Sequence, residues 1–124
     1  MLMTSTIVAM AALSGVTLGP PDALAASNVA RDAWGYCILS NAAKYAVLDE
    51  SAETIADVSV TNCSNLEPAV MKTLDSLFID NETKLSDDTI QSMISDGRKT
   101  FRNSAVSTVM EIRFKRKEKN GARN

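Results

Sequence analysis

Small and apolar side chains recur every three or four positions in residues 28–48, which is the period of an α-helix. The stripe consists of Ala30, Trp34, Cys37, Ala42, Tyr45 and Leu48. Asn28 is a suitable N-cap, and Asp32 puts a negative charge in the first turn, where the helix dipole favours it. We therefore predict a helix over residues 28–48, with Trp34 and Tyr45 on its core side.

A second helix is predicted over residues 52–65. It follows the polar turn Asp49-Glu50-Ser51, and Ser51 has a side chain suited to the N-cap. The inner stripe of this helix is Ala52, Ile55, Ala56, Ser59 and Cys63. Residues 58–61 leave an alternative open, because their alternation and β-branched side chains also suit a short strand.

A third helix is predicted to begin at Glu67-Pro68, because proline fits the first helical turn, where its missing N–H costs nothing. One face of this helix carries Val70, Met71, Leu74, Leu77 and Phe78. Residues 80–84 then form a polar loop.

The fourth predicted helix is the longest. Ser86 is its N-cap, followed by Asp87 and Asp88 in the first turn. Its stripe consists of Ile90, Ile94, Gly97, Phe101, Ala105, Thr108 and Ile112. Asp96-Gly97 could form a turn that splits it. The unbroken phase of the stripe favours one helix, in which Gly97 lets a neighbour pack closely.

The N-terminal residues 1–25 resemble a secretory signal peptide. A twelve-residue apolar run, Ile7 to Leu18, is too short to span a membrane, and Ala23 and Ala25 supply the small residues of a cleavage site before Ala26. Residues 1–6 contain no Lys or Arg, so an uncleaved anchor or an apolar tail is the alternative. We therefore expect an exported protein, periplasmic or secreted, with no transmembrane span.

The two cysteines, Cys37 and Cys63, are predicted to form a disulfide. Each lies thirteen residues from Glu50, so in an antiparallel helix pair joined there they end level with each other. Facing Cα atoms of packed helices lie about 4–5 Å apart, which a disulfide accepts. The alternatives are two buried thiols or a redox pair, but a redox pair usually has a Cys-x-x-Cys spacing, which is absent.

Together these patterns predict an all-α fold: a small bundle of about four helices, with one disulfide linking the first two. The domain is expected to cover residues 26–114. Residues 115–124 are polar and basic, contain Gly121, and are expected to fray as a C-terminal tail.

Few residues are available for catalysis. The chain has no histidine, and a disulfide leaves no thiolate. Residues 80–91 resemble a calcium loop, but Leu85 stands where glycine is needed and Gln91 where glutamate is needed. We therefore expect no enzyme activity, no catalytic residue, no cofactor and no metal.

Charge is divided between the two parts of the chain. Residues 26–96 contain 12 acidic and 4 basic side chains, whereas residues 97–124 contain 2 acidic and 9 basic ones. The basic end either complements the acidic helices or contacts an anionic surface. The candidates for that contact are Arg113, Lys115, Arg116, Lys117 and Lys119. Nucleic acid is disfavoured because aromatic residues do not interleave with these cations.

Three functions from different classes remain. The first is a non-enzymatic exported binding or interaction domain, with an unknown protein partner and a possible homodimer, which uses an exposed apolar groove or the charge-divided surface. The second is peripheral attachment to an anionic membrane or envelope surface through the basic C-terminal helix, with Phe114 at the interface. The third is a carboxylate-dependent hydrolase, which needs two carboxylates in one groove.

Overall fold

The structure, a computed structural model, describes residues 21–77 and 86–123. Four α-helices and one short 3₁₀-helix lie in these two ranges, which contain no strand. In chain order they are α2 (Pro21–Tyr45), α3 (Ala52–Asn62), η1 (Ser64–Leu66), α4 (Glu67–Leu77) and α5 (Asp87–Arg123). The predicted all-α bundle is therefore confirmed.

Helix α2 is displaced towards the N-terminus relative to the prediction. It begins at Pro21, because proline suits the first turn and the alanine-rich stretch that follows favours helix. The prediction that Asn28 is the N-cap is therefore wrong, and its side chain instead accepts a hydrogen bond from Arg31. The helix also ends at Tyr45, three residues before the predicted end.

Helix α3 confirms the predicted N-cap. The Oγ atom of Ser51 accepts a hydrogen bond of 3.1 Å from the backbone N–H of Thr54. Residues 58–61 are helical, so the alternative of a strand is wrong. The helix ends at Asn62, and Cys63 is its C-cap, so it stops three residues earlier than predicted. All five residues of the predicted inner stripe are buried.

Helices α4 and α5 follow the predicted pattern. Helix α4 begins at Glu67 with Pro68 in its first turn, while Phe78 and the predicted loop 80–84 lie outside the described residues. The side chain of Ser86 accepts a hydrogen bond from the N–H of Thr89, as an N-cap does. Helix α5 then runs unbroken through Gly97, as predicted.

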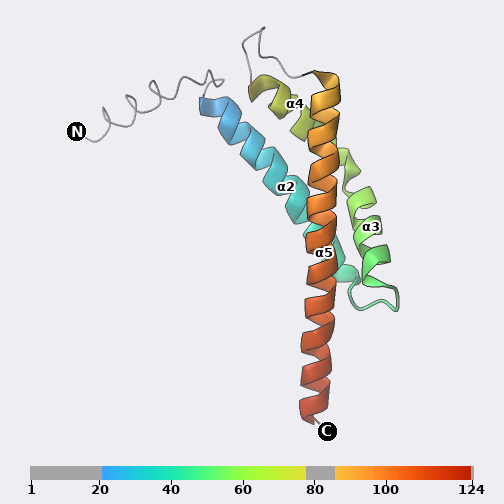
Figure 1. Cartoon of the computed structure of the whole chain (residues 1–124). Coiled ribbons are helices and arrows are strands. Elements are labelled where there is room, and N and C mark those ends of the chain that lie inside the picture. Colours follow the sequence, from blue (N-terminus) through green and yellow to red (C-terminus); the bar gives the residue numbers. More distant parts are fainter. Residues whose placement is uncertain (1–20, 78–85, 124) are drawn as a thin grey trace, which may run out of the picture.

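Helix α5 continues to Arg123, beyond the predicted domain end. Residues 115–121 are helical where fraying was expected, because Lys, Arg and Glu are good helix formers. A bond of 2.9 Å between Lys115 and Glu111 also joins successive turns. These turns are exposed on all sides and extend beyond the other helices (Figure 1).

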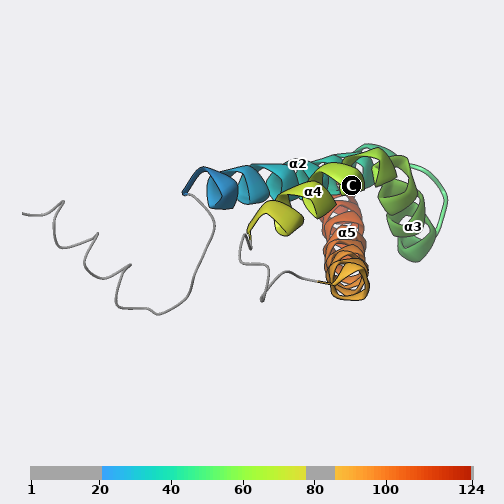
Figure 2. The same cartoon turned by 90° about the horizontal axis from the view of Figure 1, so that it is seen from above.

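The other helices are arranged around α5. Helix α2 crosses it obliquely, α3 runs beside its middle, and α4 lies near its N-terminal half (Figure 1). The view along α5 shows α2 and α4 on one flank of this helix and α3 on the next flank (Figure 2). Each helix contributes buried side chains to one core, which includes Trp34, Ile38, Ala42, Ile55, Val70, Ile94, Ala105 and Val109.

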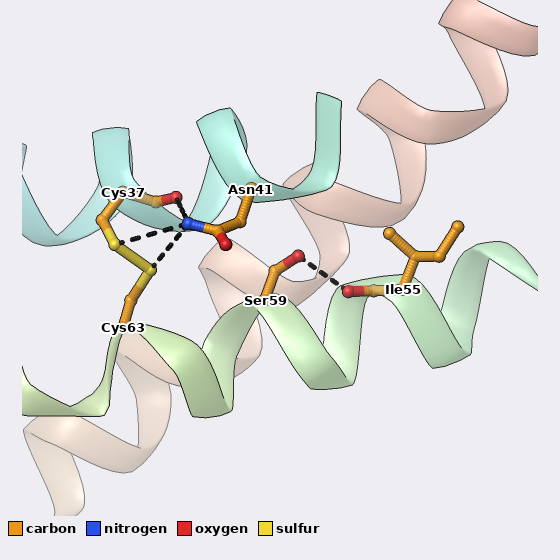
Figure 3. Close-up of a disulfide and its surroundings, with 5 residues drawn as sticks. All are labelled: Cys37, Asn41, Ile55, Ser59 and Cys63. Carbon is orange, nitrogen blue, oxygen red and sulfur yellow. Dashed lines mark hydrogen bonds between the residues drawn. A yellow bond between two sulfur atoms is a disulfide. The ribbon is translucent and has the colours of Figure 1, made fainter. Parts of the chain in front are cut away.

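The predicted disulfide between Cys37 and Cys63 is present, with its Cα atoms 6.0 Å apart (Figure 3). It joins the middle of α2 to the C-cap of α3. The side-chain N–H of Asn41 lies 3.5 Å from Sγ of Cys63 and donates a 2.9 Å bond to the carbonyl of Cys37. Figure 3 also shows buried Ser59, whose hydroxyl donates to the carbonyl of Ile55. The two cysteines therefore face each other at the same height on α2 and α3, as their equal distance from Glu50 predicts.

Among the helices in the described residues, none is both long and apolar enough to cross a membrane. The apolar run of the predicted signal peptide lies outside the described residues, and the predicted cleavage site before Ala26 falls within α2.

Candidate functional site

An apolar groove of about 600 Å³ lies between α2, α4 and α5. Helix α2 lines it with Trp34, Gly35 and Leu39, and α4 contributes Val70 and Leu74. The residues from α5 are Met93, Ile94, Gly97, Thr100 and Phe101. This volume falls in the range of small-molecule sites, which are mostly apolar and have a few polar groups at the edge.

Two contacts between a glycine and an aromatic ring hold α2 against α5 beside the groove. A Cβ atom on Gly97 would lie 2.8 Å from Cζ3 of Trp34, and one on Gly35 would lie 2.5 Å from Cε1 of Phe101. The two rings pack edge to face, with centroids 5.1 Å apart. Each helix thus places an aromatic ring on a glycine of the other, which confirms that Gly97 allows close packing.

Trp34 is the central side chain of this region and is only 2% exposed. Its indole N–H is buried and has no hydrogen-bond partner among the described residues. A buried donor without an acceptor costs about 1–3 kcal/mol, so packing of the ring is what keeps Trp34 in place. The predicted core role of Trp34 is confirmed, and Tyr45 is partly buried against the same core.

Polar side chains stand at one edge of the groove, on α2 and α5. They are Ser27, Arg31, Asp32, Tyr36 and Thr100. Arg31 lies one turn before Gly35 and one turn after Ser27, so it stands in the part of the groove nearer the start of α2. Within the described part of the chain its guanidinium bonds only the amide oxygen of Asn28, at 3.3 Å, and has no carboxylate partner.

The first basic residues of α5 complement the acidic helices. Arg98 forms two hydrogen bonds to Glu67, of 2.9 and 2.5 Å, and Arg102 bonds Asp57. Glu67 is buried, so its carboxylate needs this partner. The hydrogen bond to Glu67 raises the pKa of Arg98, and the bond to Asp57 raises the pKa of Arg102. The positive charges of Arg98 and Arg102 therefore pair with acidic residues of the same chain.

Arg113 also turns towards the protein. Its guanidinium donates hydrogen bonds to the carbonyl oxygens of Ala46, Leu48 and Glu50, at 3.0, 2.7 and 2.6 Å. It thereby holds the turn between α2 and α3 against α5. Of the five predicted surface cations, Arg113 is therefore the one with a structural role.

The other four cations lie on the exposed end of α5. Lys115 bonds Glu111 on the same helix, and this bond lowers the pKa of Glu111. Arg116, Lys117 and Lys119 have no ion-pair partner among the described residues. The structure therefore separates the basic end of the chain into cations that hold the fold and cations that face solvent.

The apolar and cationic side chains of this exposed end lie on different faces. Met110 and Phe114, one turn apart, are 59% and 62% exposed. With 3.6 residues per turn, Arg116 and Lys119 point about 160° and 140° away from Phe114, and only Lys117 lies near its side. Helices that lie flat on a membrane separate the two kinds of side chain in this way, but they bury a larger apolar face than Met110 and Phe114 provide.

The sequence suggested an exposed apolar groove as one of two possible binding surfaces, beside the stripe that contains Trp34 and Phe101, but it did not give the helices that form the groove. The available clue was the adjacent pair Trp34-Gly35, because a glycine beside a large ring allows a second helix to approach. No group of three or more acidic or cysteine side chains that could hold a metal ion occurs in the described residues. Most of the calcium-like stretch lies outside them.

Comparison of the chain with protein-family models, with curated proteins and with solved structures gives no match.

Proposed function

We propose that this chain is an exported, non-enzymatic binding domain that takes a single-chain amphiphile in the groove between α2, α4 and α5. The groove itself carries the proposal, because its walls are apolar and its volume of about 600 Å³ suits a small molecule. The apolar N-terminal run and the disulfide between Cys37 and Cys63 support export to an oxidising compartment, periplasmic or secreted.

The polar edge supports an amphiphile with an anionic head group. Arg31 is exposed at one end of the groove and has no carboxylate partner among the described residues, so its charge is available to a ligand. Leu39, two turns further along α2, and Leu74 on α4 offer apolar contact for the chain of the ligand.

The two other functions receive less support. Membrane attachment through Lys115, Arg116, Lys117 and Lys119 receives less support because Met110 and Phe114 offer only a small apolar area for burial in a membrane. A carboxylate-dependent hydrolase needs a pair of carboxylates in one groove, whereas Asp32 is the one carboxylate among the described lining residues.

Binding is tested by titrating the exported protein, whose intact mass should correspond to residues 26–124, with laurate and with dodecanol. Trp34 is the single tryptophan and lines the groove, so its emission reports occupancy. We expect a saturable change with both probes. Arg31→Gln should weaken laurate binding about two- to fivefold and leave dodecanol binding unchanged, as for a loss of one exposed ionic contact.

A matched pair of variants on α5 provides the control. Met93→Glu puts a carboxylate on the groove wall and should weaken both probes about tenfold or more. Met110→Glu makes the same change at an exposed position outside the groove and should have no effect. The proposal fails if neither probe alters Trp34 emission, or if the two glutamate variants weaken binding equally.

A further inference from the structure

Helix α2 is apolar on both of its faces. Its inner face packs against α3, α4 and α5, and its outer face is exposed and carries no charge along its centre. The residues of this outer line, which we call the α2 seam, are Val29, Ala33, Tyr36, Ser40, Ala43 and Val47. All six are exposed, and Val29, Tyr36 and Val47 are 69%, 77% and 61% exposed. A row of exposed apolar side chains on the face of a helix away from the core is normally covered by a partner.

The spacing of the seam residues indicates that the partner that packs against them is another helix. Successive seam positions are separated by four, three, four, three and four residues, which is the spacing of the two apolar positions in a heptad. Five of the six positions lie within α2, and Val47 follows in the turn after it. Such a line contacts a facing helix along its whole length.

We propose that the seam binds the seam of a second copy of this chain, with the two α2 helices antiparallel. If the twofold axis lies at the height of Ile38, each seam residue meets another seam residue of the partner copy. Tyr36 then lies opposite Ser40, so the largest side chain meets a small one. Ala33 lies opposite Ala43, where two small residues allow close approach. The seam is therefore complementary to itself.

Charge favours the antiparallel direction. Asp32 and Lys44 are the charged residues at the two edges of the seam. In the antiparallel register each lies about 18 Å along the axis from its own copy, at 1.5 Å per residue. In a parallel pair each would lie beside its copy, and the two helix dipoles would also be aligned. Only the antiparallel arrangement therefore keeps the two copies of Asp32, and the two copies of Lys44, apart.

The interface is proposed as a reversible one, because a single pair of helices buries less area than a standard protein–protein interface. Sedimentation equilibrium over about 1 μM to 1 mM should therefore show a monomer–dimer equilibrium. Ala43→Glu, which puts a charge in the seam, should shift the dissociation constant upwards by about tenfold or more. Val58→Glu changes an exposed residue of α3 outside the seam and should leave it unchanged.

Cross-linking tests the direction. Ala33→Cys and Ala43→Cys variants, mixed in equal amounts and oxidised, should form a covalent dimer, because the thiol introduced in one variant lies opposite the thiol introduced in the other. Each variant alone should not, since identical positions lie about 15 Å apart along the axis. Dimers from each variant alone would overturn the antiparallel arrangement. A protein that stays monomeric, or that binds neutral phospholipid vesicles through the same seam, would overturn the proposal. Asp32 and Tyr36 also border the groove, but the inference requires no ligand there.

Discussion

Gly35 and Gly97 allow two close approaches between α2 and α5, and although the contact at Gly35 is shorter, Gly97 faces the buried ring of Trp34. A methyl group there would lie 2.8 and 3.0 Å from two carbons of the Trp34 ring, which is buried and cannot move away. Overpacking of this kind costs about 1–3 kcal/mol, more than the helix propensity that alanine would add. The groove wall would be displaced as well.

We therefore expect Gly97→Ala to lower the free energy of unfolding by about 1 kcal/mol in urea titrations. Gly121→Ala is the matched control on the same helix, because a Cβ atom at Gly121 would meet nothing within 4 Å. That variant should be neutral or slightly stabilising. Equal destabilisation by both variants would contradict the close contact between Gly97 and Trp34.

Arg113 makes a second residue-specific prediction. Arg113→Gln removes hydrogen bonds to three carbonyl oxygens and should lower the free energy of unfolding by about 1–2 kcal/mol in urea titrations. Arg113→Lys keeps the charge but not the planar fork, so it should recover little of the loss.

Arg116→Gln serves as the control, because Arg116 is exposed and has no ion-pair partner among the described residues. It should leave stability unchanged. Full rescue by Arg113→Lys would mean that charge, and not the shape of the guanidinium group, holds the turn after α2.

At the scale of elements, the disulfide holds α2 and α3 together independently of α5. Replacing both Cys37 and Cys63 with serine removes a constraint across 26 residues of chain. We expect the free energy of unfolding to fall by about 3–4 kcal/mol and the dependence on urea to steepen, because the unfolded chain becomes less compact. The free energy of unfolding and its dependence on urea are both obtained from urea titrations of the oxidised wild type and of the serine variant. A change in stability below about 1 kcal/mol would show that helix packing alone holds the pair.

The helices themselves were largely predictable. Periodicity and the serine caps at Ser51 and Ser86 gave the right elements, because these effects act within a few residues. The predicted start of α2 is too late because the side chain of Asn28 suits a cap, although nothing in the preceding alanine-rich stretch stops a helix. Cap residues are recognisable in a sequence, but whether a given one is used depends on its neighbours.

At the scale of the whole molecule, contacts between distant parts of the chain limited the prediction. The charge division suggested that the basic end complements the acidic helices, and Arg98 and Arg102 do so. That Arg113 bonds carbonyls more than sixty residues earlier could not be deduced, since it depends on where α5 crosses the turn after α2. The groove likewise depends on how α2, α4 and α5 pack, which leaves about 600 Å³ between them.

Helix α5, which contacts every other α-helix of the described residues, is synthesised after all of them. Until it emerges, the inner faces of α2, α3 and α4 have no partner on that side, and the core lacks Ile94, Ala105 and Val109. Cys37 and Cys63 both precede it, so their disulfide requires no residue of α5. If the chain enters an oxidising compartment while α5 is still being synthesised, the disulfide keeps the first two helices in register until the core is completed.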